Sequence, residues 1–318
     1  MKKLVSIVVS VYNEEQALAR FYQETRRVLE ELTWDYEMIF VNDGSTDSSM
    51  SVLHSIASEN PKAKIVCFSR NFGHEAAMIA GLDYSQGDCI ICMDADLQHP
   101  PEYIPKIIQK IEEGYQIINM VRTKNASAGW LKRITSAGFY KVINMLSDVK
   151  FENNASDFFG IDRQAAEVLK KDYREKVRFL RGFVQNIGFK KTTIEFEAGV
   201  RVAGESKYNI KKLFAFSMNT IMCFSNMPLR LGIYAGIFSA ILGFVMMIYT
   251  IYSWLKVGTP SGYATIVVLL CFMFAVLFLI VGIIGEYIAI LFTELKNRPI
   301  YIVGETTNME ESREKNIK

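Results

Sequence analysis

The chain has 318 residues, half of them hydrophobic, which is enough for one α/β domain and an apolar appendage. Its net charge of +2, without a long basic run, excludes a nucleic-acid-binding protein that relies on general positive charge. The five cysteines show neither a zinc-type nor a secreted-domain spacing, so we expect reduced packing residues.

The N-terminal part of the chain alternates between apolar runs and segments with helical periodicity. The runs predicted as strands are Leu4–Val11, Tyr36–Val41, Ala63–Phe68, Cys89–Met93 and Gln116–Val121. This alternation predicts an α/β fold with a mostly parallel sheet. Ligands of open parallel sheets bind beyond the carboxyl ends of the strands. We therefore expect the polar clusters Tyr12–Glu14, Asn42–Gly44 and Asp94–Asp96 to border one crevice.

Asp43 follows the second predicted strand and precedes a glycine that suits a tight turn. Its carboxylate is able to accept hydrogen bonds from a nucleobase or a ribose, while Ser45 and Thr46 suit the cap of the next helix. No GxGxxG follows the first strand and no GxxxxGK(S/T) occurs, which argues against dinucleotide oxidoreductases and P-loop NTPases. The histidines are dispersed, and we interpret each as a surface or packing residue: His54, His74 and His99.

Asp94 and Asp96 lie two residues apart at the end of the fourth predicted strand. An extended backbone points both carboxylates the same way, where they make a hard-oxygen site suited to Mg²⁺ or Mn²⁺. Gln98 would supply a third oxygen, and a substrate diphosphate the remaining ligands. A solvated acidic strand end is the alternative interpretation of such a pair taken alone.

The C-terminal third contains two long stretches without a charged residue, Leu231–Leu255 and Val257–Gly285. Each is long enough to cross a hydrocarbon core of about 30 Å, so we predict two transmembrane helices joined by a short turn at Lys256–Ser261. Basic residues flanking the hairpin outnumber the single lysine of the turn, which by the positive-inside rule places the N-terminal domain in the cytoplasm. We interpret Glu286 as interfacial and expect the polar tail after Gly304 to be disordered.

Short motifs along most of the chain match one enzyme family. They are Ser6–Val9, Tyr12–Glu15, Val41–Ser45, Ser69–Gly73, Glu75–Ala76, Met93–Glu102, Phe139–Tyr140, Arg178–Phe179, Arg181–Gly182, Arg201, Gly204, Ser206–Tyr208 and Pro228–Arg230. In these motifs the chain resembles the family 2 glycosyltransferases of the GT-A fold. Within that family it is similar to the polyprenyl-phosphate glycosyltransferases, which are typified by bactoprenol glucosyltransferase and dolichol-phosphate mannose synthase.

The resemblance implies a role for each matching site residue. The nucleotide-sugar donor is implied to bind Tyr12, Glu14, Asp43, Arg201 and Lys207. The metal ion is implied to bind Asp94, Asp96 and Gln98. The acceptor phosphate is implied to contact Arg122, Lys132, Arg133 and Ser136. An arginine fork and a flexible lysine charge both suit phosphate oxygens.

Asp157 matches the proposed catalytic base of the similar enzymes, so the resemblance implies catalytic roles for Asp157, Asp94 and Asp96. Those enzymes usually carry Asp-Phe-Arg-Leu at this point, whereas Phe159 replaces the arginine here, a departure that bears on how the sugar is held. A phosphate monoester has a second pKa of about 6 and needs little general-base help. Orientation and charge stabilisation should therefore supply most of the acceleration.

We predict transfer of a sugar, glucose first, with inversion from a nucleotide sugar to undecaprenyl phosphate. The product would be a lipid-linked monophosphosugar for modification of cell-envelope glycans, and the cofactor Mg²⁺ or Mn²⁺. UDP-N-acetylglucosamine and GDP-mannose are the alternative donors. A processive polysaccharide synthase is disfavoured because no QxxRW-type motif and no further spans occur, and a non-catalytic membrane scaffold is the alternative from another class.

The predicted organisation has four parts: a cytoplasmic GT-A domain (1–210), interfacial juxtamembrane helices (211–230), two transmembrane helices (231–293) and a cytoplasmic tail (294–318). The segment before the hairpin is rich in Phe and Met and is expected to lie at the membrane surface. The resemblance further implies an inner-membrane homo-oligomer. A lipid flippase and a glycan-transferring membrane enzyme would act downstream of it.

Overall fold

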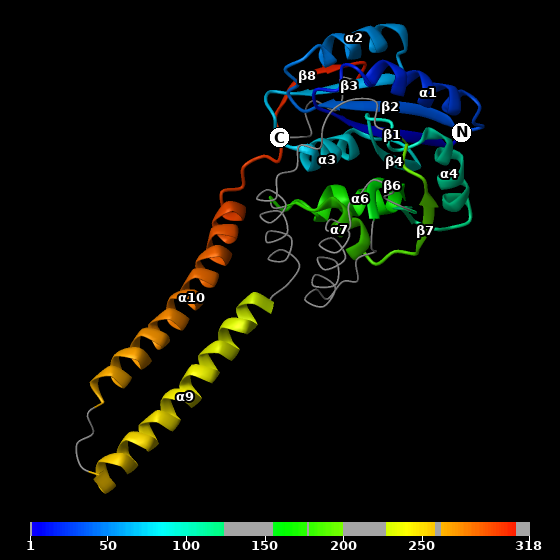
Figure 1. Ribbon diagram of the computed structural model, residues 1–318. Coiled ribbons are helices and arrows are strands. Elements are labelled where there is room, and N and C mark those ends of the chain that lie inside the picture. Colours follow the sequence, from blue (N-terminus) through cyan, green and yellow to red (C-terminus); the bar gives the residue numbers. More distant parts are fainter. Residues whose placement is uncertain (1, 124–154, 177, 200–226, 258–261, 310–318) are drawn as a thin grey trace.

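The computed structural model describes residues 2–123, 155–176, 178–199, 227–257 and 262–309 (Figure 1). The strands are β1 (Leu4–Val11), β2 (Asp35–Asn42), β3 (Ala63–Phe68), β4 (Cys89–Asp94), β5 (Ile117–Arg122), β6 (Ala155–Asp162), β7 (Lys191–Phe196) and β8 (Val303–Thr307). The helices are α1 (Leu18–Glu30), α2 (Ser49–Glu59), α3 (His74–Tyr84), η1 (Pro101–Tyr103), α4 (Ile104–Glu112), α6 (Arg163–Asp172), α7 (Leu180–Asn186), α9 (Met227–Val257) and α10 (Tyr263–Leu295).

All these strands form one eight-stranded sheet in the order β7-β5-β6-β4-β1-β2-β3-β8. The pairs β1–β2, β1–β4, β2–β3 and β5–β7 are parallel, while β6 runs antiparallel between β4 and β5, and β8 runs antiparallel to β3. The predicted α/β fold with a mostly parallel sheet is confirmed. The five predicted strands correspond to β1–β5, whereas β6, β7 and β8 were not predicted.

Helices cover both faces of the sheet, which explains why its central strands are continuous apolar runs. One core cluster packs α1, α2 and α4 on one face, and a second packs α3, α6 and α7 on the other. The α3 helix comes unusually close to β1, because a Cβ on Gly81 would lie 2.1 Å from Val8 Cγ1. This close packing holds the later part of α3 against β1.

After α10 the chain returns to the sheet as β8, beside β3 (Figure 1). The expectation of disorder after Gly304 is therefore wrong for Glu305–Thr307. An edge strand such as β3 exposes unpaired backbone groups, and a following segment of any moderate β-propensity is able to pair with them. The sequence pattern alone did not reveal this long-range pairing.

Helices α9 and α10 extend together from the sheet domain (Figure 1), and both are long and apolar enough to cross a membrane. The second helix begins at Tyr263 and continues past Gly285, where the uncharged stretch ends, to Leu295, close to the predicted boundary at residue 293. Glu286 thus lies inside α10 rather than after it. The uncharged stretch predicts where the apolar surface ends but not where the helix ends. A helix continues through polar residues of good helix propensity.

Candidate active site

Strands β1 and β2 end side by side at one edge of the sheet, and the loops that follow them form hydrogen bonds with each other. The Asn13 N–H donates to Ser45 Oγ at 3.0 Å, and Asn13 Oδ1 accepts from the Thr46 N–H at 2.8 Å. Asn13 adopts a left-handed φ of 56°, which asparagine tolerates better than most residues. This turn carries Tyr12, whose side chain is exposed, and the partly exposed Glu14 at the carboxyl edge of the sheet.

Asp43 is 2% exposed, and backbone amides bind both of its carboxylate oxygens. Oδ1 accepts from the Phe72 N–H at 2.6 Å and Oδ2 from the Gly73 N–H at 2.9 Å. Burial raises the pKa of Asp43, and these two N–H groups oppose the shift. Gly44 is required beside it, because a Cβ there would lie 2.7 Å from the Arg70 carbonyl carbon. Asp43 thus fixes the loop between β3 and α3, and its contact with a nucleotide stays a prediction.

The end of β4 carries Asp94, Asp96 and Gln98 at partly exposed positions that alternate with three buried residues. The Gln98 N–H donates to Asp96 Oδ1 at 3.0 Å, which holds this carboxylate in place. Burial raises the pKa of Asp94 to about 6, and His74 opposes this shift. The neighbouring carboxylates of Asp157 and Asp96 add to it. The acidic groups predicted to bind a metal ion therefore lie close together.

His99 is a buried residue that supports this strand end, which confirms its interpretation as a packing residue. Its Nδ1 accepts the Asp94 N–H at 2.9 Å, so the other ring nitrogen carries the hydrogen and donates to Ser156 Oγ at 2.8 Å. Burial lowers the pKa of His99 to about 3, and the ring is neutral. The ring stacks on Phe158 at 5.1 Å, and Arg122 Nη2 lies 3.4 Å from its Nε2.

Asp157 reaches the same place from β6, because this strand pairs antiparallel with β4. Arg181 Nε lies 2.8 Å from Asp157 Oδ1, and His74 Nε2 lies 3.8 Å from Asp157 Oδ2. Burial raises the pKa of Asp157, but the charges of Arg181 and His74 outweigh it and hold the pKa below its usual value. Asp157 is therefore an ionised carboxylate at neutral pH.

His74 is the site residue that the sequence interpretation missed. It begins α3, its Nδ1 lies 2.7 Å from Ser10 Oγ, and its Nε2 lies 3.7 Å from Asp94 Oδ1. Burial lowers the pKa of His74, but the surrounding carboxylates outweigh it and raise the pKa. The next residue, Glu75, accepts the Leu180 N–H at 2.8 Å and so links α3 to the helix of Arg181. The available signal was position, since His74 follows the third parallel strand at the same edge as the three polar clusters.

The other predicted site residues fall into two groups. Arg122 ends β5 next to His99 and is partly exposed. Those that lie outside the described residues are Lys132, Arg133, Ser136, Arg201 and Lys207. The segment 211–226 of the predicted interfacial helices lies outside them as well.

The oxygen ligands at the end of β4 suit a Mg²⁺ or Mn²⁺ ion that takes its remaining ligands from a substrate. Within the described ranges no group of three or more His, Cys, Asp or Glu side chains is placed to enclose an ion. Asp94 and Asp96 instead offer two neighbouring carboxylates, and Gln98 adds an amide oxygen. Magnesium sites commonly use one or two carboxylates and take further ligands from water and phosphate.

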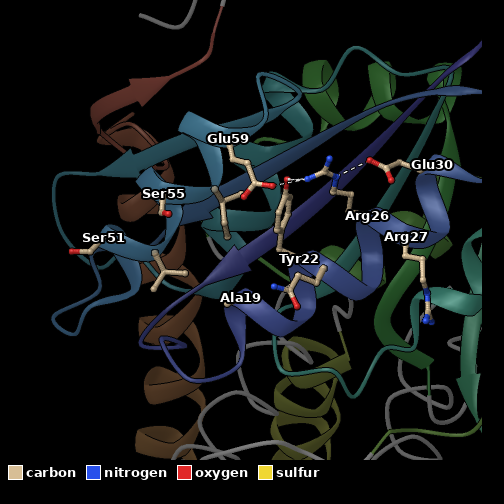
Figure 2. A pocket seen from close by; sticks show the side chains of 11 residues that line it. Ala19, Tyr22, Arg26, Arg27, Glu30, Ser51, Ser55 and Glu59 are labelled. Atoms are coloured by element: carbon tan, nitrogen blue, oxygen red, sulfur yellow. Dashed lines mark hydrogen bonds and ion pairs between the residues drawn. The ribbon is translucent and has the colours of Figure 1, made fainter.

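A separate surface hollow of about 570 Å³ lies between α1 and α2 (Figure 2). Its side chains are mutually paired: Arg26 Nε lies 2.7 Å from Glu30 Oε1, and Arg26 Nη1 lies 2.8 Å from Glu59 Oε1 and 3.3 Å from the Tyr22 hydroxyl. None of the predicted site residues lines it. The hollow is therefore distinct from the carboxyl edge of the sheet.

Residues 6–169 match the model of Glycosyl transferase family 2, and residues 227–291 match that of the GtrB C-terminal hairpin. The chain belongs to glycosyltransferase family 2. This membership confirms the family resemblance seen in the sequence and identifies the mostly parallel sheet domain as a GT-A fold.

This family 2 glycosyltransferase has relatives of nearly the same length. It is 41% identical to the "Uncharacterized glycosyltransferase YkcC" of Bacillus subtilis, over 97% of this chain and 95% of the relative. It is 37% identical to the "SfII prophage-derived bactoprenol glucosyl transferase" of Shigella flexneri, over 95% and 98%. It is 36% identical to the "Prophage bactoprenol glucosyl transferase homolog" of Escherichia coli, over 94% and 98%.

Proposed function

We propose that this glycosyltransferase moves a sugar from a nucleotide sugar to a polyprenyl phosphate, with UDP-glucose as the donor and undecaprenyl phosphate as the acceptor. The observation that carries the proposal is the meeting of Asp94 and Asp96, at the end of β4, with Asp157 on the neighbouring β6. Relatives named bactoprenol glucosyl transferases support the acceptor class. The two apolar helices support an enzyme that works beside a membrane.

The donor would bind along the edge formed by β1, β2 and β4. Tyr12 and Glu14 lie on the loop after β1 and would contact the nucleoside, since an exposed aromatic ring suits a flat base. Asp94, Asp96 and Gln98 would hold Mg²⁺ or Mn²⁺ against the diphosphate. When bound, the ion neutralises the charge that builds on the departing nucleoside diphosphate. Asp43 would hold the loop between β3 and α3 in place beside this site through its two hydrogen bonds with backbone amides.

Asp157 would orient the reacting groups rather than remove a proton. The phosphate of the acceptor has a second pKa of about 6 and is already largely deprotonated at neutral pH. The Asp157 carboxylate is ionised and held by Arg181, which fixes it beside Asp94. The acceptor oxygen would attack the anomeric carbon directly, the bond to the nucleoside diphosphate would break, and the configuration of the sugar would invert.

The other predicted site residues, most of them basic, would bind the phosphate groups of the two substrates. Arg122, at the end of β5, lies at the same edge of the sheet as Asp94 and would contact the acceptor phosphate. Its predicted companions in that role are Lys132, Arg133 and Ser136. The residues predicted to close over the donor phosphates are Arg201 and Lys207.

The membrane hairpin would keep the active site at the cytoplasmic face, where nucleotide sugars are made. Arg230 lies in the first turn of α9 and Lys296 follows α10, so basic residues flank the ends that adjoin the sheet domain. Of the predicted interfacial segment 211–230, residues 227–230 belong to α9, and residues 211–226 would lie along the membrane surface. In this arrangement the phosphate of a membrane-held lipid would meet the carboxyl edge of the sheet.

The direct test is transfer by the purified full-length protein. We would incubate it with undecaprenyl phosphate, Mn²⁺ or Mg²⁺, and labelled UDP-glucose, UDP-N-acetylglucosamine or GDP-mannose, and measure label in the organic phase. We expect the strongest transfer from UDP-glucose and an inverted anomeric configuration by NMR of the product. Label that enters the lipid equally well with the Asp96→Asn variant would show that transfer does not depend on the carboxylate pair. No label in the lipid from any of the three donors would support a non-catalytic scaffold instead.

A further inference from the structure

The residues after α10 form a strap, Ile300–Asn308, that binds the catalytic domain (Figure 1). Its strand β8 lies on the edge of the sheet, where Cys67 pairs with Glu305 and Val66 with Thr306. The first residues of the strap are buried, and Ile300 is only 7% exposed. The strap is thus part of the folded domain, although the membrane hairpin separates it from the rest of that domain in sequence.

Side chains hold the strap at both of its ends. Tyr301 stacks on Phe68 with ring centroids 5.1 Å apart, and its hydroxyl donates to Asp83 Oδ2 at 2.7 Å. Arg174 binds the same carboxylate with Nη1–oxygen distances of 2.8 and 3.0 Å. At the other end, Asn308 Nδ2 donates at 2.8 Å to the Ala57 carbonyl in α2 and at 2.8 Å to the Ala63 carbonyl at the start of β3. These contacts secure the strap to α2, α3 and the segment after α6.

The last turn of α10 contacts the catalytic domain directly. Glu294 Oε1 accepts the Lys176 N–H at 2.6 Å, and Arg178 Nη1 donates to the Ile300 carbonyl at 3.4 Å. Between these two contacts the chain crosses only the exposed linker Lys296–Pro299. The end of the second membrane helix is therefore tied to the domain before and after a short linker.

The strap also borders the loop that shapes the active site. The Ser69 N–H donates to the Ile302 carbonyl at 2.9 Å, directly after β3 ends. The same loop continues to Phe72 and Gly73, whose amides bind Asp43, and then to His74 at the start of α3. One short stretch of backbone thus connects the membrane anchor to the site.

We propose that the strap is a positioning segment, which sets the height and tilt of the sugar-transfer site over the membrane so that a membrane-held acceptor phosphate reaches it. This inference rests on the proposed function. A positioning role makes a specific demand: loss of the tether between α10 and the strap must slow transfer to a membrane-held acceptor. It must not slow transfer to an acceptor that diffuses to the site from water.

The closing experiment cuts the tether in the folded protein. A protease site is inserted between Asn297 and Arg298, and the full-length protein is reconstituted in lipid nanodiscs and cleaved. Transfer is measured before and after cleavage with undecaprenyl phosphate in the bilayer and with a water-soluble short-chain polyprenyl phosphate. We expect cleavage to reduce the first rate about tenfold, since small misplacements of reactants are costly, and to leave the second unchanged.

The two acceptors separate the possible failures. Equal losses with both acceptors, or no loss with either, would overturn the positioning role. If the uncleaved protein transferred sugar to neither acceptor, the proposed function would fail while the strap contacts could still be tested. The uncleaved insertion variant is the matched control for any effect of the added residues.

A second measurement tests the strap without an activity assay. Glu305→Cys places a thiol opposite the native Cys67, within reach of a disulfide across an antiparallel pair. Oxidation should form this bond within one chain, and the Cys67→Ser, Glu305→Cys variant serves as the control. A disulfide between two chains, or none, would contradict a strap that positions the site of its own chain. Loss of transfer after oxidation would also overturn the proposal, because a positioning strap stays bound during the reaction.

Discussion

The two halves of the sheet build the active site in different ways. From β1 to β4 the strands are parallel and end at one edge, so each strand adds a polar loop at the carboxyl edge of the sheet. In the other half, the antiparallel β6 brings Asp157 to Asp94 from a distant part of the chain. The β1–β4 side of the site is thus set by local pattern and the β6 side by long-range pairing. Substitutions on the two sides should therefore affect transfer in different ways.

The largest effect is expected at the end of β4. Asp96→Asn removes one of two charges available to a divalent cation, and we expect a loss of transfer rate of about 10³-fold. The same variant should bind Mn²⁺ more weakly, measured by electron paramagnetic resonance, with unchanged thermal unfolding. Asp172→Asn, at the exposed end of α6, is the matched control and should keep full activity. An Asp96→Asn enzyme with normal transfer would remove the carboxylate pair from the mechanism.

On the β6 side, a pair of residues should act as one unit. Because Arg181 Nε lies 2.8 Å from Asp157 Oδ1, each side chain positions the other. We expect Asp157→Asn and Arg181→Gln each to lose about 10²-fold in kcat/KM, and the double variant to lose little more than either. Losses that multiply in the double variant would show that the two residues act independently.

Sequence pattern predicted the half of the site that depends on local order. The runs that became β1–β4 were visible because both faces of each strand are buried, and their polar ends gave Tyr12, Asp43 and Asp94. His74 was missed because a lone histidine at a helix start belongs to no motif. Its position after the third parallel strand was the one signal, and its contacts with Asp94 and Asp157 give it a role. The role of Asp157 came from family resemblance, since nothing local marks β6 as a neighbour of β4.

The strap shows the same limit in the segment that follows α10. The apolar stretches predicted two long helices, because a lack of charge over such a length is a strong signal. The return of Val303–Thr307 to the sheet was not predicted, because its stability comes from the edge of β3 and the Asp83–Tyr301 contact rather than from its own composition. Pairing across the whole length of a chain leaves no periodicity to detect.

A smaller effect concerns stability rather than rate. The pKa of Asp94 is raised to about 6 from its ordinary 3.8, so the folded protein without metal binds a proton there more tightly than the unfolded chain does. This stability is fully present below about pH 4 and is lost as the pH rises through about 6. At pH 7 Asp94→Asn should therefore stabilise the metal-free protein by roughly 1–3 kcal/mol while it lowers transfer.

Thermal unfolding in detergent with a chelator, at pH 5 and pH 7, measures this difference. The gain in stability of Asp94→Asn over the wild type should be larger at pH 7. The Asp172→Asn protein should follow the wild type at both values. An equal gain at the two pH values would contradict a raised Asp94 pKa.

The smallest effect is expected at the hollow between α1 and α2, where charge is abundant but none of the predicted site residues lies (Figure 2). Arg26→Ala removes contacts to Glu30, Glu59 and Tyr22, but ion pairs at an exposed surface are screened by water and salt. We expect transfer rates and the Michaelis constants for both substrates to stay at wild-type values, with at most a slight shift in thermal unfolding. A changed Michaelis constant for either substrate would mean that this surface communicates with the carboxyl edge of the sheet. The effect would reach the site through α1 and the loop between β1 and α1, which carries Tyr12 and Glu14. The Michaelis constant for the nucleotide sugar is therefore the more sensitive of the two measurements.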